Sequence, residues 1–268
     1  MAKKYNYINV HDLLKKFSEH QYVKKVHYRT EVFSTNDFAK TLVHLDKPDY
    51  PQLVVADKQT KGRGRFLRKW ESPVAENIYT TWVMKTIIPL QYLPSFTLAV
   101  AVAIIGAIQQ ETGIKLQVKW PNDIMYEQKK VGGILTEFEA VENENFYLIV
   151  GIGLNTNMAI ERLSTPLQKT ATSLYEITQK NFDRLNLLYT LCKYLGETYD
   201  EFKETGLRKF KNVWLRLCPY IGKKIKIVSG NTSFEGIAYS IGEDGAFILK
   251  FENGNLQSFY SGEITLLE

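Results

Sequence analysis

The sequence predicts an α+β fold, in which a mixed or antiparallel sheet carries helices on one side and a small all-β unit follows. Between residues 26 and 217, short β-rich runs alternate with helical runs, without the regular succession of long apolar strands and helices that marks a doubly wound fold. From about Tyr220 the helical pattern stops, and short strands divided by turn residues take over. This change indicates two structural units.

The expected strands of the larger unit are rich in β-branched and aromatic residues, and they are residues 53–57, 77–84, 115–120, 132–140 and 146–155. The expected helices are residues 36–45, 94–112 and 183–204. The stretch TLAVAVAIIGAI (residues 97–108) is the most apolar in the chain, but it is shorter than the roughly 20 residues of a membrane span. We therefore predict a helix buried against the sheet and no membrane segment.

Residues 1–27 form a polar and basic extension in which Val10, Leu13, Leu14 and Phe17 stand at helical spacing. We predict one short amphipathic helix that covers a sheet edge, and a disordered leader is the alternative. No apolar run or small-residue cleavage site follows the basic start, so no signal peptide is predicted. A metal site would need ligands on one face and a supporting carboxylate, so we interpret the four histidines, which all fall in the first 44 residues, as exposed.

Residues 220–268 contain four or five short strands and no helical pattern. Their turns include Asp244-Gly245 and Asn253-Gly254, dipeptides that favour tight hairpins. So short an all-β segment predicts a small barrel, which gains stability by docking on its neighbour.

Charge and cysteine content limit the function only broadly. The net charge is +5, with acids and bases mixed along the chain, and this excess is too small to indicate nucleic-acid binding by itself. The two cysteines, Cys192 and Cys218, lack metal-ligand spacing and are too few for a disulfide framework, which favours a reducing compartment. The predicted location is the cytoplasm.

The stretch KGRGRFLRKW (residues 61–70) interleaves glycines with arginines. Glycine lets the backbone approach a ligand closely, and each guanidinium offers a planar fork to a carboxylate or a phosphate. The stretch matches neither a P-loop nor a GxGxxG fingerprint. A flexible basic loop is therefore the alternative, and Trp70 is either a core residue or a platform for a flat ring.

Three further segments place polar residues at the ends of predicted strands. In KWPND (residues 119–123), Pro121 ends a strand and leaves Asn122 and Asp123 at its tip, although an ordinary turn would have the same sequence. Lys130 precedes the glycine-opened strand VGGIL, where its point charge would stand beside a bound anion. GIGLN (residues 151–155) ends another strand in a polar tip.

Taken in order, these motifs resemble those of biotin protein ligases, the enzymes that biotinylate carboxylases. The likeness extends from about Tyr28 to Glu268, and GRGR followed by KWPND at this spacing is its most specific part. The other shared motifs are Ser34-Thr35-Asn36, QTK (residues 59–61), Trp70, KVGGIL (residues 130–135), GIGLN, ATSL (residues 171–174) and SGEI (residues 261–264).

The resemblance implies a class II synthetase-like catalytic domain at residues 28–219, an SH3-like barrel at residues 220–268, and a two-step reaction. Biotin and ATP with Mg²⁺ give biotinyl-5′-AMP, and a lysine of a biotin carboxyl carrier protein, or of a carboxylase biotin domain, then attacks the anhydride. The reaction needs no enzyme nucleophile.

The resemblance also implies the site residues. Arg63, Arg65 and Lys130 would be catalytic, because fixed cations suppress repulsion between the biotin carboxylate and the α-phosphate. The implied biotin contacts are Ser34, Thr35, Asn36, Gln59, Arg63, Gly64, Arg65, Lys130 and Gly133. The implied ATP contacts are Arg65, Trp70, Asn122, Lys130 and Asn155. Mg²⁺ would be held by the ATP phosphates, and Asp123 would either help to place it or support its own turn.

Two positions depart from the family pattern. Leu67 stands where the family motif GRGRxGRxW has a third glycine. Leucine does not adopt a positive φ cheaply, so the loop is expected to close differently or to leak. Leu267 stands where some members have an arginine, which puts a nucleotide contact from the barrel in question.

Some members of the family carry an N-terminal winged helix-turn-helix that binds operator DNA. Residues 1–27 are too few for such a domain, so we predict the monofunctional type, without DNA binding. In the family an exposed sheet edge serves both self-pairing and carrier docking, so a homodimer through a sheet edge is an option.

Three other functions stay open at the level of the sequence. A lipoate protein ligase would share the catalytic fold, but GRGR, KWPND and the small barrel argue against it. A DNA-binding repressor lacks its winged domain. A catalytically idle biotin sensor is disfavoured by the intact Arg63, Arg65 and Lys130.

Overall fold

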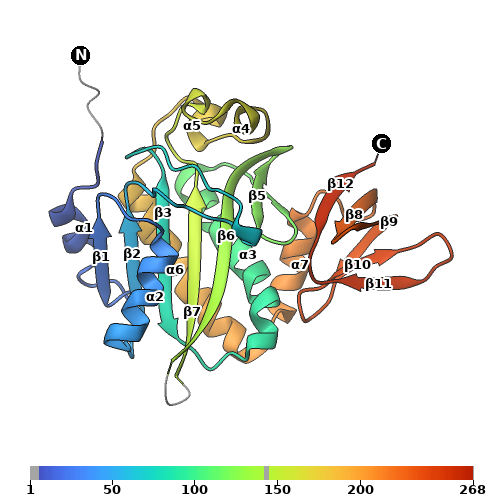
Figure 1. Ribbon diagram of the computed structural model, residues 1–268, viewed down its shortest axis with the longest axis horizontal. Helices are drawn as coiled ribbons and strands as arrows, with labels where there is room; N and C mark the ends of the chain where they lie inside the picture. Colours follow the sequence, from blue (N-terminus) through green and yellow to red (C-terminus); the bar gives the residue numbers. More distant parts are fainter. Residues whose placement is uncertain (1–5, 142–144, 268) are drawn as a thin grey trace.

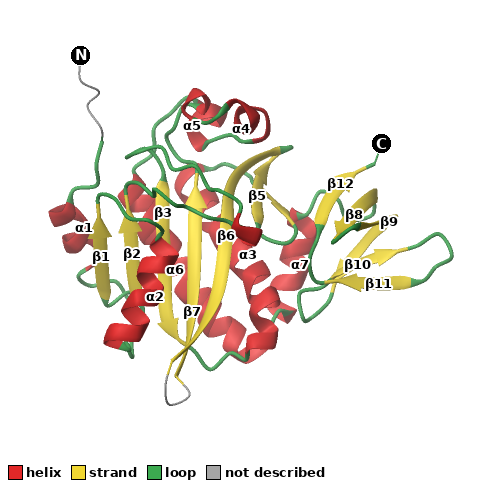
Figure 2. Ribbon diagram, in the orientation of Figure 1, coloured by secondary structure: helices red, strands yellow, loops and turns green. Residues whose placement is uncertain are grey.

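A seven-stranded mixed sheet lies at the centre of the computed structural model, which describes residues 6–141 and 145–267 (Figures 1 and 2). Its spatial order is β1-β2-β3-β7-β6-β5-β4. The strands are β1 (Lys25–Arg29), β2 (Gln52–Ala56), β3 (Ile78–Lys85), β4 (Gln117–Lys119), β5 (Asp123–Tyr126), β6 (Lys129–Val141) and β7 (Asn145–Leu154). β1 pairs with β2 in parallel, and the other described neighbours are antiparallel, so the predicted mixed sheet is confirmed.

Alternate residues of the strands face two separate cores, because successive side chains of a strand point to opposite faces. Leu53 and Val55 of β2 belong to the main core, together with α3 (Leu93–Thr112) and α6 (Arg184–Thr205). Val54 belongs to a second, smaller core with α2 (Thr35–Asp46). The two long helices therefore share one face, as predicted. α2 departs from the one-sided arrangement and covers the opposite face (Figure 1).

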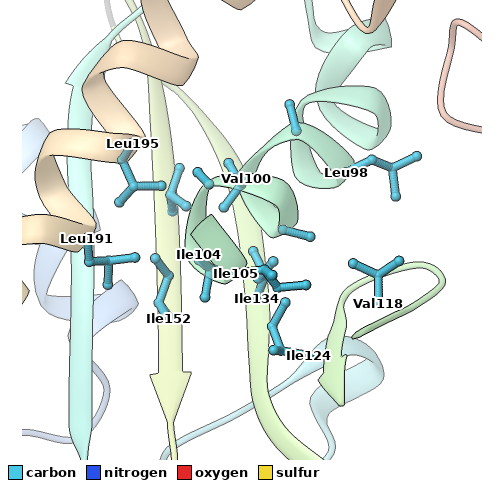
Figure 3. Packing of buried hydrophobic residues seen from close by; sticks show 14 of the residues in the cluster. Leu98, Val100, Ile104, Ile105, Val118, Ile124, Ile134, Ile152, Leu191 and Leu195 are labelled. Carbon is cyan, nitrogen blue, oxygen red and sulfur yellow. The ribbon is translucent and has the colours of Figure 1, made fainter. Parts of the chain in front are cut away.

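Helix α3 forms the middle of the main core. Figure 3 shows Ile152 of the sheet between Leu191 of α6 and Ile104 of α3. Each such buried side chain contributes about 1.5–3 kcal/mol. By length and apolar composition, Leu90–Thr112 would pass for a membrane span, but 61% of its apolar 18-residue stretch is buried inside the protein. The buried core helix expected from the sequence is confirmed.

Each predicted element of the larger unit has an observed counterpart, with ends shifted by a few residues. The elements that the sequence analysis did not predict are β1, β5, α4 (Thr165–Thr170), α5 (Leu174–Thr178), α7 (Arg208–Leu217) and the 3₁₀ turns Arg65–Leu67, Leu90–Tyr92 and Ile160–Arg162. They are short, and α7 buries only Trp214 among its ten residues. Asp123, expected at the tip of the preceding strand, opens β5, and the tight β4–β5 hairpin pairs it with Lys119.

The N-terminal segment folds onto the sheet edge through α1 (Val10–Phe17). Asn9 caps this helix by accepting hydrogen bonds from two backbone N–H groups, and Leu13 and Phe17 are buried while Val10 and Leu14 stay exposed. α1 lies beside the edge strand β1 and against α6 (Figure 1). This placement agrees with the predicted cover of a sheet edge for the described part of residues 1–27; residues 1–5 lie outside the described residues.

A buried ion pair fastens the same segment. Arg184 Nη1 lies 2.7 Å from Asp57 Oδ1, and both side chains are almost fully buried. Asp57 also accepts a hydrogen bond from the backbone N–H of Ile8, and Arg184 donates to the carbonyl of Asn6. Because an unpaired buried charge would be costly, removing either partner is expected to loosen residues 6–8 from the sheet.

The C-terminal unit is a five-stranded antiparallel sheet in the order β11-β10-β9-β8-β12, which agrees with the predicted all-β unit. Its strands are β8 (Lys224–Ser229), β9 (Thr232–Ile241), β10 (Phe247–Lys250), β11 (Leu256–Phe259) and β12 (Glu263–Leu266). Trp120 of the β4–β5 hairpin donates its indole N–H to the carbonyl of Gly245 and packs on Phe247. A Cβ on Gly245 would lie 2.5 Å from the nitrogen of Ser95, so only glycine permits this docking.

Two histidines contradict the expectation that all four are exposed, because His27 is half-buried against Gln52 and His20 is fully buried. His20 is 2% exposed, and its Nδ1 accepts hydrogen bonds from the N–H groups of Tyr22 and Val23, at 3.1 Å each. Its Nε2, 3.2 Å from the carbonyl of Tyr189, is therefore the donor. Burial lowers the pKa of His20. The ring is a neutral structural group, and among the described residues no cluster of three or more His, Cys, Asp or Glu could hold a metal ion.

This burial makes stability depend on pH. The folded-state pKa of His20 lies below its unfolded value of about 6.5, so the unfolded chain takes up the proton first as the pH falls. We expect the free energy of unfolding, measured by urea denaturation, to decrease as the pH is lowered from 7.5 through 6.5 to 5.5. His20→Gln should flatten this part of the profile, whereas the exposed His11→Gln should not. Equal slopes in the wild type and the His20→Gln variant would contradict the assignment.

Candidate active site

A cavity of about 500 Å³ lies where the N-terminus of α2 and the loop before β3 meet the ends of β5, β6 and β7 and the C-terminal strand β12. Every site residue predicted from the sequence lines it, although these residues are up to 121 positions apart. The lining includes six basic residues, Arg63, Arg65, Arg68, Lys69, Lys119 and Lys130, and three acidic residues, Glu71, Asp123 and Glu263. The lining thus carries an excess of three positive charges, which attracts anions.

One end of the cavity is polar and uncharged. Ser34 is the N-cap of α2, and its hydroxyl accepts a hydrogen bond from the N–H of Asp37. The N–H and the hydroxyl of Thr35 both donate to Gln59 Oε1, at 2.9 and 3.2 Å. Ser34 and Thr35 are nearly buried. These contacts fix the side-chain amide of Gln59 beside the start of the helix, where it offers a rigid set of donors and acceptors.

Asn36 is held from three sides. Its Oδ1 accepts from the hydroxyl of Thr81 (2.7 Å), and its Nδ2 donates to the carbonyl of Leu135 (3.1 Å) and to Glu137 Oε2 (2.7 Å). A Cβ on Gly151 would lie 2.1 Å from Asn36 Oδ1, so the glycine of the GIGLN segment makes room for this side chain. The orientation of the Asn36 amide is therefore determined by its surroundings.

The Gly-Arg stretch folds into a tight hairpin rather than a loose basic loop. The N–H of Trp70 donates to the carbonyl of Gly62 (2.8 Å), and the N–H of Gly64 donates to the carbonyl of Arg68 (2.7 Å). A Cβ on Gly62 would lie 2.7 Å from the Trp70 carbonyl, so this crossing requires glycine. Arg68 also forms an ion pair with Glu263 of β12, which joins the hairpin to the C-terminal sheet.

The tip of this hairpin carries the family departure at Leu67. Phe66 and Leu67 have φ of 54° and 58°, in the left-handed region that disfavours a side chain. Both side chains are exposed, Leu67 by 82%. The backbone thus keeps a conformation suited to glycine although leucine occupies it, and the expectation that this residue makes the loop close differently stays a prediction.

Arg63 lines the cavity, but its guanidinium is paired with two carboxylates. Its Nη2 lies 2.6 Å from Asp37 Oδ1, and its Nη1 and Nη2 lie 3.0 and 3.1 Å from the two oxygens of Glu137. Burial acts to lower the pKa of Arg63, but the hydrogen bonds to Asp37 and Glu137 outweigh it and raise the pKa. The charge of Arg63 is therefore compensated by two carboxylates.

Arg65 is different. Among the described residues it forms no ion pair, and its guanidinium lies 5.1 Å from the ring centre of Phe66. Burial and the nearby Arg68 lower its pKa, and Asp123 partly offsets this. A guanidinium stays protonated under such conditions, so Arg65 is a half-buried cation whose charge is available to an anion.

Lys130 and Asp123 form an ion pair, with Nζ 2.6 Å from Oδ1, on the neighbouring strands β6 and β5. Lys130 Nζ also lies 5.4 Å from the ring centre of Trp70, within the range of a cation–π contact. The two contacts hold the ammonium group over the floor of the cavity.

Two glycines of the sheet leave the space in which the Trp70 ring packs. A Cβ on Gly153 would lie 2.6 Å from the indole ring, and a Cβ on Gly133 would lie 3.2 Å from it. The indole N–H is buried and has no hydrogen-bond partner within the described part of the chain. Trp70 is therefore a flat aromatic surface packed on the sheet inside the cavity, with one donor unused.

The remaining predicted residues serve the frame of the cavity. Asn122 Nδ2 donates to the carbonyl of Ile134 (2.7 Å), and the buried Asn155 donates to the carbonyl of Thr172 (3.0 Å). A Cβ on Gly64 would lie 3.8 Å from its nearest neighbour, so Gly64 leaves open space.

Sequence reasoning missed two residues. Lys119 lines the cavity and forms no ion pair among the described residues, although it stands in the KWPND motif, which was the available signal. Glu137 binds both Asn36 and Arg63, and no sequence signal marks it, because its partners lie 101 and 74 positions away.

The residues present do not build a metal site of their own. Asp123 is the only acidic residue in the KWPND segment, and its ion pair with Lys130 already engages one carboxylate oxygen. Divalent cations such as Mg²⁺ take several oxygen ligands. Within residues 6–141 and 145–267 no group of three metal-binding side chains is available to supply them.

Comparison with known proteins shows the family to which the chain belongs. The model of the Biotin/lipoate A/B protein ligase family matches residues 28–155, and that of the biotin protein ligase C-terminal domain matches residues 220–267. The bifunctional ligase/repressor BirA of Bacillus spizizenii is 34% identical over 239 residues, which cover 89% of this chain and 73% of that protein.

The chain belongs to the biotin protein ligase family.

Other members support the same activity. A structure of the Aquifex aeolicus biotin protein ligase in complex with biotin and ATP superposes with a TM-score of 0.77 and 31% identity, over 91% of this chain and 99% of that one. The biotin–[acetyl-CoA-carboxylase] ligase of Paracoccus denitrificans is 28% identical over 204 residues, which cover 74% of this chain and 83% of that protein. The activity predicted from the motifs, ATP-dependent biotin ligation, is confirmed.

The left-handed backbone of Leu67 can be tested by comparing two variants. Both Leu67→Gly and Leu67→Ala remove the exposed side chain, but only glycine escapes the steric penalty of a positive φ. We expect the glycine variant to exceed the alanine variant in free energy of unfolding by about 1 kcal/mol, measured by chemical denaturation. Equal stabilities would show that residue 67 has an ordinary backbone conformation.

Proposed function

We propose that this cavity condenses biotin with ATP to biotinyl-5′-AMP and then transfers the biotinyl group to a lysine of a biotin carboxyl carrier domain. The observation that carries the proposal is that the implied biotin and ATP residues line one cavity with an excess of three positive charges. Both reacting groups, a carboxylate and a phosphate, are anions. Fixed cations lower the energy of bringing them together and of the charge that develops at phosphorus.

Arg65 is the residue to which we assign most of this charge stabilisation. Its guanidinium is half-buried and forms no ion pair with the residues that the structure describes, so it can bind the α-phosphate or the biotin carboxylate without first breaking one. Lys119, which lines the same cavity, would add a second such charge. In a partly dehydrated site these charges act more strongly than they would in water.

Lys130 would contact both anions from its place over Trp70. In this assignment Asp123 positions the ammonium group through the 2.6 Å ion pair, and it is not a direct ligand of Mg²⁺. Mg²⁺ would arrive bound to the ATP phosphates, where it would neutralise part of their charge.

The polar end of the cavity suits the biotin head group. The ureido ring needs donors and acceptors in a fixed arrangement, and Ser34, Thr35, Asn36 and Gln59 offer them at the start of α2. Trp70 would support the adenine ring, and Asn122 and Asn155 would keep the neighbouring strand ends in place. The biotin carboxylate would then face the phosphate near Arg65 and Lys130.

The acceptor and the cellular setting follow from chemistry. A biotin carboxyl carrier domain supplies the lysine, and transfer would take place in the cytoplasm, which suits the two free, buried cysteines. We assign the catalytic work to residues 28–219 and a wall of the cavity to residues 220–268, where Glu263 holds Arg68.

The proposal is tested by incubating the protein with ATP, Mg²⁺, biotin and an isolated biotin carboxyl carrier domain. We expect the carrier mass to rise by one biotinyl group, and we expect no increase when ATP is omitted or when the acceptor lysine is replaced by arginine. Lipoate in place of biotin should give no product. Efficient lipoylation, or an inert protein in biotin-dependent pyrophosphate exchange, would overturn the proposal.

The role of Arg65 leads to a specific prediction. Arg65→Gly removes the guanidinium that would retain the adenylate, so biotinyl-5′-AMP should escape and label lysines on unrelated proteins. We expect at least a tenfold rise in biotinylation of added serum albumin, detected by streptavidin blotting. Lys61→Gly, in the same stretch but outside the cavity lining, is the control. Labelling confined to the carrier in the Arg65→Gly variant would refute this role.

A further inference from the structure

One carboxylate outside the predicted site ties together two of its walls. Glu137 lies on β6, on the same side of the sheet as α2, and its side chain is 19% exposed. Its Oε2 accepts from Asn36 Nδ2 at 2.7 Å and from Arg63 Nη2 at 3.1 Å. Its Oε1 accepts from Arg63 Nη1 at 3.0 Å and from Lys40 Nζ at 2.9 Å. Both oxygens are thus fully engaged.

The two main partners come from different elements, which the ion pair between Arg63 and Asp37 of α2 also joins. Asn36 belongs to the N-terminus of α2, which forms the polar end of the cavity, and Arg63 belongs to the hairpin of residues 62–70. The contact between Arg63 and Glu137 is bidentate, a geometry that restricts the guanidinium in both position and orientation. A shift of the hairpin relative to α2 would therefore break the contact with Glu137.

The electrostatics agree with a permanent contact. Burial acts to raise the pKa of Glu137, but the hydrogen bonds from Arg63, Asn36 and Lys40 outweigh it and lower the pKa. Glu137 is accordingly ionised near neutral pH. Arg63 would have to give up two carboxylates, Glu137 and Asp37, before it could bind a ligand anion.

We propose that Glu137 is a positioning residue for biotin binding, which fixes the Asn36 amide and, through Arg63, the hairpin of residues 62–70 over the cavity. Arg63 is then a strut of the hairpin, and the anion-binding role expected for its side chain passes to Arg65 and Lys119. The inference rests on the proposed function, because it assigns the polar end of the cavity to biotin.

A purely structural role for the ion pair between Glu137 and Arg63 predicts a different result. If the pair only stabilised the fold, Glu137→Gln would lower the melting temperature and leave the kinetics of the folded enzyme unchanged. A positioning role affects biotin more than ATP, because Asn36 and Gly64 lie at the end of the cavity assigned to biotin. Trp70 stays packed on Gly133 and Gly153 of the sheet, and Asn155 keeps its hydrogen bond to Thr172.

The experiment measures biotin-dependent pyrophosphate exchange by the full chain, with KM determined separately for biotin and for ATP. For Glu137→Gln we expect a rise of at least tenfold in the KM for biotin, and a change of less than about threefold in the KM for ATP. Glu139→Gln is the matched control, since Glu139 lies two residues further along β6, contacts Lys40 and His44, and does not line the cavity. It should leave both constants unchanged.

Two further variants extend the test: one measures the coupling between Glu137 and Arg63, and the other replaces Glu137→Gln if that variant does not fold. In the Glu137→Gln background, Arg63→Gln should raise the KM for biotin by a smaller factor than it does alone, because the contact between Arg63 and Glu137 is already lost and only the contact with Asp37 remains to be broken. Independent, multiplying effects would contradict the coupling. Arg63→Lys keeps the charge but loses the bidentate geometry, so it serves if Glu137→Gln does not fold, and it should raise the KM for biotin selectively.

The outcomes separate the two proposals. A wild-type protein without exchange activity would refute the proposed function. An active wild type whose KM for biotin is unaffected by Glu137→Gln and Arg63→Lys, or equally affected by Glu139→Gln, would refute only the role of Glu137.

Discussion

In the proposed function two anions meet in this cavity, and the repulsion between them is the constraint on which the rest of the site depends. Two unit charges 4 Å apart interact by about 4 kcal/mol at an effective dielectric constant of 20. The cavity lining, with six basic and three acidic residues, offsets this repulsion by its excess of positive charge. Basic side chains also repel one another, so each one brought into the cavity needs a partner or a place where its charge is not crowded.

The structure divides these cations into two kinds. Lys130 and Arg68 are held by single carboxylates, Asp123 and Glu263, and Arg63 is held by two. Such ion pairs fix the position of a basic side chain, but the carboxylate neutralises much of the electric field of its charge. Arg65 forms no pair among the described residues and keeps its full charge. Preorganised geometry and an available charge are thus supplied by different residues of one hairpin.

Glycines matter here chiefly because they leave space. Gly133 and Gly153 leave a bed for the indole of Trp70, and Gly151 leaves room for the amide of Asn36. Each lies on the central strands β6 and β7, where a Cβ would push a functional group off the sheet. The C-terminal sheet completes the enclosure, because Gly245 lets it approach α3 closely and β12, together with the preceding Gly262, contributes residues 262–265 to the cavity wall.

The sequence by itself determined the local and the chemical parts of this account. Hydrophobic periodicity located the long helices and most strands, the hairpin dipeptides located the C-terminal sheet, and the ordered motifs identified the family and every cavity residue that was predicted. Tertiary structure alone decided the rest. Short elements such as β1 and β5 carry too little pattern, and their pairing partners stabilise them. The side of the sheet chosen by α2, the burial of His20 and the pairing of Arg63 with Glu137 depend on contacts between residues far apart in the chain. A basic residue in a motif indicates that charge is present, but whether that charge is free or neutralised depends on a carboxylate that only the folded sheet brings beside it.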